Sequence, residues 1–412
     1  MRVLVVNAGS SSLKLRVLGD TDAVESTLDL ERWSGDASGD ELTAFVRDAG
    51  AVDAVGHRVV HGGNRFRAAT RITVDGARDG SPAEAPDVNR GSTAVLHPVG
   101  GAGGGAAPVG PERGHGGGGL DDAVVDELTA LTELAPLHQP RALSAIRALN
   151  RLLPDVPAVA CFDTTFHADL PAPASTVALP SRLRERFGLR RFGFHGLSHA
   201  YAARRALALA GAPSSARVVT CHLGAGASLA AVRQGRSRDT TMGFTPLEGL
   251  VMATRCGSLD PGLVLWLLEH GGLSVGELGG ILERESGLAG LSGVGGDLRD
   301  VYAAADDGDD ACALAIEVYL HRLRADIAAM TAALGGLDVL VFTGGVGEHQ
   351  PRVRAATAAG LAYLGVAVDD DANAAAPKDA VISAADARVS SVVVTAREDL
   401  EIARQTRAAL AD

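Results

Sequence analysis

The sequence predicts an α/β protein with mixed sheets, built from two similar halves. Short β-branched runs alternate with helical stretches along most of the chain, and one strand–turn–strand pattern occurs twice. The length of 412 residues, at about 150 residues per domain, leaves room for two or three domains. We therefore expect two domains of one class, each contributing a turn to a common cleft.

The expected strands are short and apolar. They are residues 3–6, 156–162, 218–223, 339–342 and 392–394. Helical periodicity is clear where Asp121, a candidate N-cap, precedes apolar positions in 124–134, and again in 143–153, where Pro154 stops the helix. The longest expected helix covers residues 311–334.

The repeated pattern is a hairpin with a turn of small residues. Residues 5–12 lead into a second strand at 15–18, and residues 220–228 lead into one at 229–232. Gly and Ser at such turns let backbone N–H groups point at an anion with no side chain in the way. Together with a third glycine turn at 344–347, the pattern predicts phosphate loops around a shared cleft.

Composition narrows the class of function. Apolar residues make up 46% and charged residues 21%, as in folded globular proteins, and the net charge of −12 argues against a nucleic-acid binder. No apolar run approaches the roughly 18 residues of a membrane span, and the start turns polar too soon for a signal peptide. The four cysteines lie far apart without a CxxC pair, which indicates reduced thiols in a cytoplasmic protein and no zinc site.

Residues 73–120 differ from the rest of the chain because they are rich in glycine and proline and end in four consecutive glycines. Such a segment offers little apolar surface to offset the entropy lost on ordering. We therefore expect a flexible surface insertion there.

Several short motifs bounded by Gly or Pro concentrate His, Arg and Asp side chains. With the two hairpins, they resemble the acetate kinase family, within the superfamily of acetate and sugar kinases, Hsp70 and actin. The motifs that carry the resemblance are residues 7–14, 57–63, 162–167, 192–199, 222–228, 242–256, 342–348 and 398–403. They occur in the family's order over nearly the whole chain, and only residues 73–120 fail to match.

The resemblance implies the reaction ATP + acetate ⇌ ADP + acetyl phosphate, dependence on Mg²⁺ with Mn²⁺ as an alternative ion, and usually a homodimer. It also implies two actin-like (ribonuclease H-like) domains with mixed sheets flanked by helices and a cleft between them. We expect residues 1–165 and 398–412 in the N-terminal domain and residues 166–397 in the C-terminal domain. The expected location is the cytoplasm, with no nucleic-acid or membrane partner.

The resemblance also assigns the charged residues of the site. Asn7 and Glu398 match the Mg²⁺-site residues. Arg58 and Arg255 match two arginines whose guanidinium groups can clamp a carboxylate or the oxygens of a transferring phosphoryl group. His195 matches a third group that stabilises the transition state by donating a hydrogen bond to a phosphoryl oxygen.

Asp163 matches the family's acid/base residue, but elementary chemistry argues against a base. The pKa of acetate lies far below 7, so no proton needs to be removed at neutral pH. We therefore expect Asp163 to orient Arg58 or His195 through a charge-assisted hydrogen bond, and the phosphoryl group to move by in-line transfer.

The remaining matches concern the two substrates. The terminal phosphates are matched to Ser10, Ser12 and Lys14. A small apolar pocket for the acetate methyl group is matched to Val60, Leu137, Phe194 and Pro246. The second phosphate loop consists of His222, Leu223, Gly224, Ala225 and Gly226. The adenosine-binding segments consist of Asp297, Leu298, Arg299, Gly345, Val346, Gly347, Glu348 and His349.

Three positions depart from the family pattern. Ala225 stands where Asn is usual, Leu298 replaces Phe and His349 replaces Asn, so the choice of nucleotide stays open, with pyrophosphate as a further donor. One alternative is a kinase for propionate or another short carboxylate, because one methylene changes binding by only ~1–3 kcal/mol. The other is a non-catalytic, actin-like nucleotide-binding protein, which would have no use for Arg58 and Arg255 together.

Overall fold

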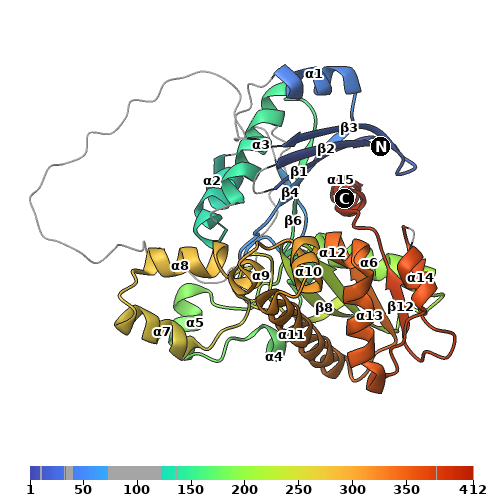
Figure 1. Ribbon diagram of the computed structural model, residues 1–412. Coiled ribbons are helices and arrows are strands. Elements are labelled where there is room, and N and C mark those ends of the chain that lie inside the picture. Colours follow the sequence, from blue (N-terminus) through green and yellow to red (C-terminus); the bar gives the residue numbers. More distant parts are fainter. Residues whose placement is uncertain are drawn as a thin grey trace, which may run out of the picture.

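The computed structural model describes residues 1–9, 12–31, 33, 40–72, 122–135, 138–376 and 378–411. The predicted insertion at 73–120 lies outside the described residues. The described chain forms two lobes, each built on a six-stranded mixed sheet with helices on its faces (Figure 1). The predicted class, α/β with two mixed sheets, is confirmed.

The first sheet has the strand order β3-β2-β1-β4-β6-β5. Its strands are β1 (Val3–Ala8), β2 (Ser12–Leu18), β3 (Val24–Glu31), β4 (Ala54–Val59), β5 (Thr70–Ile72) and β6 (Ala158–Phe162). Strands β1, β4 and β6 are parallel, and β2 runs antiparallel to β1 and to β3. The three parallel strands therefore end at the same edge of the sheet.

The second sheet has the strand order β11-β12-β10-β7-β8-β9. Its strands are β7 (Arg217–Leu223), β8 (Ala227–Arg233), β9 (Arg236–Thr240), β10 (Val339–Thr343), β11 (Ala380–Val381) and β12 (Ser390–Val393). Reading β7 to β12 as β1 to β6 reproduces the order of the first sheet and the sense of every strand pair. The duplication that the hairpins indicated thus extends to two whole sheets.

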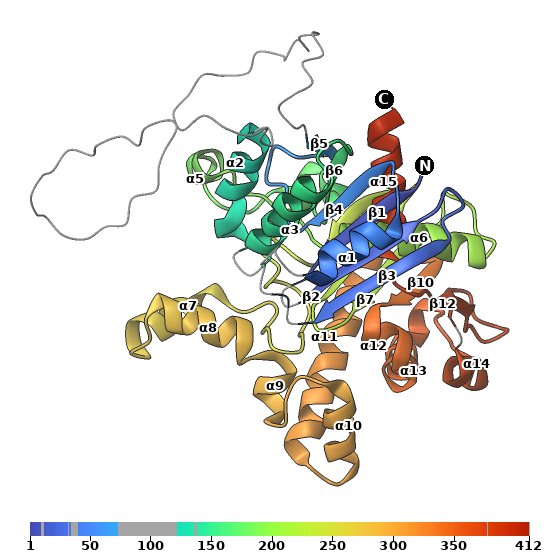
Figure 2. The same ribbon diagram turned by 90° about the horizontal axis from the view of Figure 1, so that it is seen from above.

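Helices cover both faces of each sheet (Figure 2). Those that follow the first sheet's strands are α1 (Asp40–Ala49), α2 (Asp122–Ala130) and α3 (Gln139–Leu152). The second half contains α4 (Ala172–Ser175), α5 (Ser181–Phe187), α6 (Gly196–Leu209), α7 (Pro261–His270), α8 (Val275–Arg284), α9 (Gly287–Ser292), α10 (Leu298–Asp306), α11 (Asp310–Leu334), α12 (Gly344–His349), α13 (Pro351–Gly360) and α14 (Asp370–Ala375). The chain ends in α15 (Glu398–Ala411), and short 3₁₀ helices lie at Leu131–Leu134, Thr165–His167 and Ala362–Leu364.

The last helix, α15, belongs with the first sheet in space. Side chains alternate along β1, so Leu4 and Val6 pack toward α3, whereas Val3 and Val5 pack with Ile402 of α15. In the second lobe α11 covers one face and α6 the other. Helices α6 and α15 contact each other between the two sheets, so this helix pair joins the two lobes.

Several sequence predictions need correction. Residues 344–347 form no turn: β10 leads directly into α12. Gly344 makes this change of direction with φ of 79°, where a Cβ would lie 2.7 Å from the carbonyl oxygen of Leu223. The helix predicted to continue to residue 134 ends at Ala130 and gives way to a 3₁₀ turn.

Two general features complete the description. The four cysteines form no disulfide, and three of them are buried. Within the described ranges, we find no helix with the length and apolarity that a membrane crossing needs.

Candidate active site

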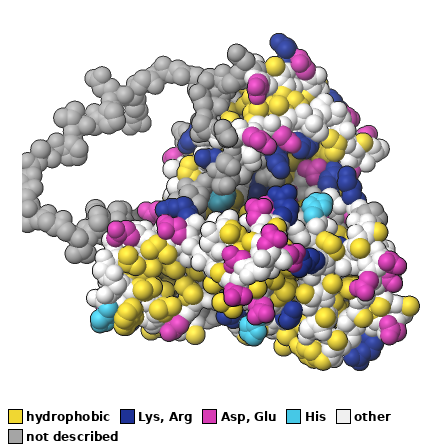
Figure 3. Space-filling view, viewed as in Figure 1, with side chains coloured by type: hydrophobic (Ala, Val, Ile, Leu, Met, Phe, Trp, Pro, Cys, Tyr) yellow, Lys and Arg dark blue, Asp and Glu magenta, His cyan; other side chains and the backbone are white. Residues whose placement is uncertain are grey.

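The site lies where the carboxyl ends of the parallel strands of both sheets face each other. Asn7 on β1 and His222 on β7 line one cavity of about 370 Å³ together with Glu398, the first residue of α15. In the space-filling view a hollow between the lobes is lined by Lys or Arg, Asp or Glu, and His side chains (Figure 3). Ligands of open α/β sheets bind at this edge.

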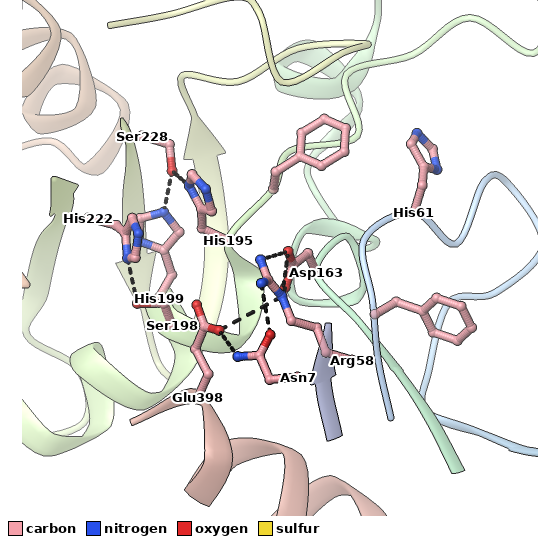
Figure 4. A network of polar contacts seen from close by, with 12 residues as sticks. Asn7, Arg58, His61, Asp163, His195, Ser198, His199, His222, Ser228 and Glu398 are labelled. Atoms are coloured by element: carbon pink, nitrogen blue, oxygen red, sulfur yellow. Dashed lines mark hydrogen bonds and ion pairs between the residues drawn. The ribbon is translucent and has the colours of Figure 1, made fainter. Parts of the chain in front are cut away.

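A network of ion pairs and hydrogen bonds forms the first lobe's side of the site (Figure 4). Arg58, near the end of β4, donates through Nη2 to Asp163 Oδ2 at 2.7 Å and through Nη1 to Asn7 Oδ1 at 3.0 Å. Asn7 in turn donates to Glu398 Oε2 at 2.9 Å, and Arg58 Nε lies 3.8 Å from the same oxygen. Asp163 lies directly after β6 and is only 1% exposed. Its carboxylate accepts hydrogen bonds from Arg58 and so orients the guanidinium.

The network keeps its charges fixed. Burial would lower the pKa of Arg58, but the charges of Asp163 and Glu398 raise it, so the guanidinium stays protonated. Burial raises the pKa of Asp163, and Arg58 opposes that rise. Burial would also raise the pKa of Glu398, but Arg58, His222 and Asn7 lower it. The first lobe therefore presents a cation held between carboxylates.

The second lobe presents neutral imidazoles and a glycine turn. His195 precedes α6 in the left-handed region, with φ of 55°, and its ring stacks on that of His222 with centroids 4.4 Å apart. Burial, followed by His222, His199 and the charges of Arg58 and Arg255, lowers the pKa of His195 well below its usual value. The ring is therefore neutral at pH 7.

Arg255 reaches the same place from the loop after β9. A Cβ built on Gly226 would lie 3.4 Å from His195 Nε2 and 3.5 Å from Arg255 Nη1, so both groups face this glycine. Arg255 donates to the carbonyl of Pro246 at 3.2 Å and has no ion pair with a described carboxylate. Burial lowers the pKa of Arg255, and Glu283 partly opposes the shift. Its remaining N–H donors are available to an anion.

A second cavity, of about 540 Å³, continues from the glycine turn. Eight residues of the predicted nucleotide segments line it, namely Gly224, Ala225, Asp297, Leu298, Arg299, Gly345, Val346 and His349. Gly345 also lines the cavity of Asn7 and Glu398, so the two spaces are neighbours. Such a shape suits an elongated ligand with phosphates near Glu398 and a ring system near α10.

The predicted apolar pocket is brought together in part. Val60 and Phe194, which come from different lobes, are buried in one apolar cluster. Pro246 lies beside Arg255, whose Nη1 donates to its carbonyl oxygen. Leu137 and the phosphate residue Ser10 lie outside the described residues.

Other predicted residues have partners that suit a structural role. Leu223 is buried in the core, and Gly347 packs against Phe342. Glu348 Oε1 accepts hydrogen bonds from the backbone N–H groups of Gly344 and Ala396, which ties the start of α12 to the loop before α15. Glu348 also lines the cavity of Asn7 and Glu398.

The two hairpin turns have different lengths. Ala8 pairs with Leu13 across residues 9–12, whereas Leu223 pairs with Ala227 across the shorter stretch 224–226. On the described strands, Lys14 of β2 lines the cavity of Asn7, whereas Ser12 starts β2 beside Gly9.

The comparisons with known proteins agree with this geometry. The family model described as the Acetokinase family matches residues 117–404, well over half of the chain. This chain belongs to the acetokinase family. Among its acetokinase-family relatives, the acetate kinase of Halothermothrix orenii is 36% identical over 440 residues, which cover 98% of both chains. That of Gloeobacter violaceus is 43% identical over 365 residues, 88% of this chain and 78% of the other.

Solved acetokinase-family structures have the same fold. The acetate kinase of Porphyromonas gingivalis superposes with a TM-score of 0.79 at 31% identity, and each chain covers 99% of the other. A propionate kinase of Francisella tularensis reaches 0.80 at 30% identity with the same coverage. The predicted actin-like fold class is therefore confirmed.

Sequence reasoning missed several residues of this acetokinase-family site. Thr254, Tyr319 and Gln350 line the larger cavity, and Tyr319 gives no local signal because it belongs to the apolar face of α11. Ser228, which contacts His195, lies at the end of the repeated hairpin motif. The sequence could have indicated Ser228 as a site residue through its position in that motif.

The donor set near α15 suits a hard cation. Among the residues that the structure describes, no group of three or more His, Cys, Asp or Glu side chains is placed to hold a metal ion. Glu398 accepts from Asn7 through Oε2, and its Oε1 makes no hydrogen bond with a described residue. Mg²⁺ usually takes one or two carboxylates, substrate phosphates and several waters, so one carboxylate beside a phosphate-sized cavity fits this ion.

Proposed function

We propose that this acetokinase-family chain transfers the terminal phosphoryl group of ATP to acetate, reversibly, giving ADP and acetyl phosphate. The observation that carries the proposal is Arg58, held by Asp163 and Asn7 at the meeting point of the two lobes, where Asn7 lines a cavity of about 370 Å³ that adjoins one of about 540 Å³. The relatives named above as acetate kinases support the choice of reaction.

The nucleotide occupies the larger cavity in this proposal. Its adenosine lies along Asp297, Leu298, Arg299, Gly345, Val346 and His349, and its phosphates lie toward Gly224, Ala225, Gly226 and His222. Ser10, Ser12 and Lys14 approach the phosphates from the opposite lobe. Backbone N–H groups of glycine turns suit phosphate oxygens because no side chain intervenes, and the Lys14 ammonium adds a point charge.

Mg²⁺ is the proposed cofactor, with Mn²⁺ as an alternative. Glu398 would hold it through its carboxylate, and Asn7 would orient Glu398 through the hydrogen bond at 2.9 Å. When bound, the ion neutralises charge on the phosphate oxygens. Glu398 is the first residue of α15, so the ion would also meet the N-terminal end of that helix.

Acetate binds with its carboxylate toward the arginines and its methyl group toward Val60, Phe194, Pro246 and Leu137. A guanidinium suits a carboxylate because its planar donors match the two oxygens. Asp163 acts as an orienting group and not as a base, because both of its oxygens accept hydrogen bonds from Arg58 and acetate carries no proton at neutral pH.

Charge stabilisation is the main source of catalysis in this proposal. Arg58 is fixed before substrate binds, so no reorganisation is needed when negative charge shifts in the transition state. Arg255 and His195 converge on Gly226 from the other lobe and donate to the transferring group. In-line transfer then requires positioning and fixed charge alone.

A specific observation keeps propionate as the second candidate acceptor. The superposed structure from Francisella tularensis is named a propionate kinase, and an apolar wall discriminates one methylene only weakly. A purely nucleotide-binding role is less well supported, because it gives the buried Arg58–Asp163 pair no purpose.

We also propose the domain division of residues 1–165 with 398–412 and residues 166–397, which the packing of α15 on β1, β4 and β6 supports. A cytoplasmic location stays a prediction.

A homodimer is supported by the surface of α7 and α8. Trp266 of α7 is 55% exposed and Val275 of α8 is 77% exposed, and Leu263 and Leu265 lie on the same exposed helix. Hydrophobic side chains gather over this part of the lower lobe in Figure 3. An apolar face of this kind marks an interface, and a second copy of the chain is the partner we propose. Sedimentation of the wild type and of Trp266→Glu tests this: the variant is expected to be monomeric.

The decisive experiment is a coupled assay for ADP formation that depends on the acceptor. We expect acetate to give the highest kcat/KM, propionate a lower one and butyrate the lowest, with ATP preferred over pyrophosphate. An Arg255→Ala preparation made in parallel is the control for contaminating kinases. No acceptor-dependent turnover in the wild type would contradict the proposal.

A further inference from the structure

Four buried or half-buried side chains form a chain of hydrogen bonds that ends on His195, and Figure 4 shows the part that runs from His199 through Ser228 to His195. Thr220 Oγ1 lies 2.7 Å from His199 Nδ1, His199 Nε2 lies 2.7 Å from Ser228 Oγ, and Ser228 Oγ lies 3.0 Å from His195 Nδ1. Thr220 and Ser228 come from the adjacent strands β7 and β8, His195 directly precedes α6, and His199 lies in the first turn of that helix.

Each neutral group in this row of hydrogen bonds has one proton to donate, so all donors point the same way, either toward His195 or away from it. Thr220 has two acceptors within reach, His199 Nδ1 at 2.7 Å and the carbonyl of Ala230 at 3.4 Å. A hydroxyl donor normally lies about 2.5–3.0 Å from its acceptor, so Thr220 is placed to donate to His199 Nδ1. His199 then donates through Nε2 to Ser228, and Ser228 donates to His195 Nδ1.

This direction fixes the tautomer of His195. With Nδ1 accepting from Ser228, the single ring proton sits on Nε2, which faces Gly226 and Arg255 in the site. The opposite direction would place a lone pair there and repel an anionic oxygen. Because the second lobe keeps His195 neutral, the ring can donate to a phosphoryl oxygen only in the first arrangement.

We propose that Thr220, His199 and Ser228 are positioning residues that hold His195 with its Nε2–H toward the transferring phosphoryl group. This inference rests on the proposed function for its catalytic consequence. The hydrogen-bond chain itself is a property of the free protein. It is separate from His222, whose Nδ1 contacts Ser198 instead.

The kinetic test removes the hydroxyl of Thr220, the proton donor that lies farthest from His195 in the row of hydrogen bonds. Thr220→Val keeps the shape of the side chain and should lower kcat by roughly tenfold to a hundredfold, because a transition-state donor is lost in part of the population, while KM for ATP and acetate changes little. Thr220→Ser restores the hydroxyl and should recover most of kcat. The control is Thr240→Val on β9, which removes a buried hydroxyl bonded to the carbonyl of Leu229 at 2.7 Å and should leave kcat unchanged.

A spectroscopic test reads the tautomer directly. In ¹⁵N-histidine NMR of the substrate-free protein, the His195 signals, identified by their absence in His195→Gln, should show a protonated Nε2 and an unprotonated Nδ1. In Thr220→Val the opposite tautomer should become populated. Protonated Nδ1 in the wild type, or unchanged kcat in Thr220→Val, overturns the inference. An inactive wild type overturns the proposed function instead, and the tautomer measurement still decides the hydrogen-bond chain.

Discussion

The two lobes share a strand order but present opposite chemistry to the cleft. At the carboxyl ends of β1, β4 and β6 stand Asn7, Arg58 and Asp163, joined with Glu398 in a network of fixed charge. At the corresponding edge of the second sheet stand His222, a glycine turn and the glycines of α12. The comparison shows that the common frame determines where a site forms, and the side chains at each strand end determine what the site does.

The two lobes also present hydrogen-bond donors to an anion in two different ways. The first lobe uses a guanidinium that is always charged and pairs it with buried carboxylates. The second lobe uses neutral imidazoles whose donors depend on tautomer, together with Arg255, which lacks a described carboxylate partner.

Removing the cation of the first lobe should have the largest effect. Arg58→Ala should lower kcat by about 10²–10³-fold and also destabilise the fold by about 3–5 kcal/mol, because Asp163 is left buried without its partner. Steady-state kinetics and urea unfolding measure the two effects. The double variant Arg58→Ala/Asp163→Asn should recover stability without recovering activity. Equal stability of the two variants would show that the pair is not a buried charge pair.

Acid should act through histidines of both lobes, because burial lowers the pKa of His57 to about 3 and of His61 and His138 to about 4 in the first lobe. The pKa of His167 is lowered to about 4 by burial, and the pKa values of His195, His199 and His222 are lowered by the same cause. These rings stay neutral in the folded protein but gain protons on unfolding below pH 6.5. The unfolded state therefore binds more protons, and the free energy of unfolding should fall by about 1–2 kcal/mol per histidine from pH 7 to pH 5.

Urea unfolding across this pH range measures the slope. His167→Gln should reduce the slope by the share of one histidine. A slope that does not respond to His167→Gln would mean that this ring already takes up a proton in the folded state.

Removing the cation of the second lobe should cost activity but not stability. Arg255→Ala should lower kcat by about 10²-fold, while the free energy of unfolding changes by less than about 1 kcal/mol because no described carboxylate loses a partner. The contrast with Arg58→Ala is the sharpest form of the comparison between lobes. A stability loss as large as that of Arg58→Ala would contradict it.

The smallest expected effect is a gain. Ala225→Asn adds a side-chain amide at an exposed position that lines the nucleotide cavity. A charge-assisted hydrogen bond to phosphate contributes about 1.5–3 kcal/mol, so kcat/KM for ATP should rise roughly tenfold, at saturating acetate. If the variant is no better than the wild type, another group or a water already fills this place.

The sequence predicted the buried strands well and the polar ones poorly. Strands β1, β7 and β10 consist of apolar residues on both faces and were expected within one or two residues. Strand β4 was missed because its sequence contains Gly56, His57 and Arg58, and β3 and β9 were missed because edge strands alternate with polar residues. Tertiary packing, and not local strand propensity, makes strands of these three segments.

The residues of the candidate site also divide into those that the sequence predicted and those that it did not. Arg58, Asp163 and the glycine turn were found because short motifs in family order mark them. The contact of Asn7 with Glu398 joins the two ends of the chain, and no local pattern encodes it. The role of Thr220 was invisible for another reason: a buried threonine in an apolar strand looks like any other strand residue until the partner of its hydroxyl is known.

The return of α15 to the first lobe has a consequence for synthesis on the ribosome. Strands β1 to β6 are made before the second lobe, but the helix that covers Val3, Val5 and Cys161 begins only at Glu398, after the second lobe. At about 5–20 residues per second, the first lobe waits roughly 10–50 s for its second cover. During that time Asn7 has no Glu398 to donate to, and the apolar face beside it is open. The nascent first lobe is therefore a natural client for chaperones, and kinase activity should appear only after α15 has been made.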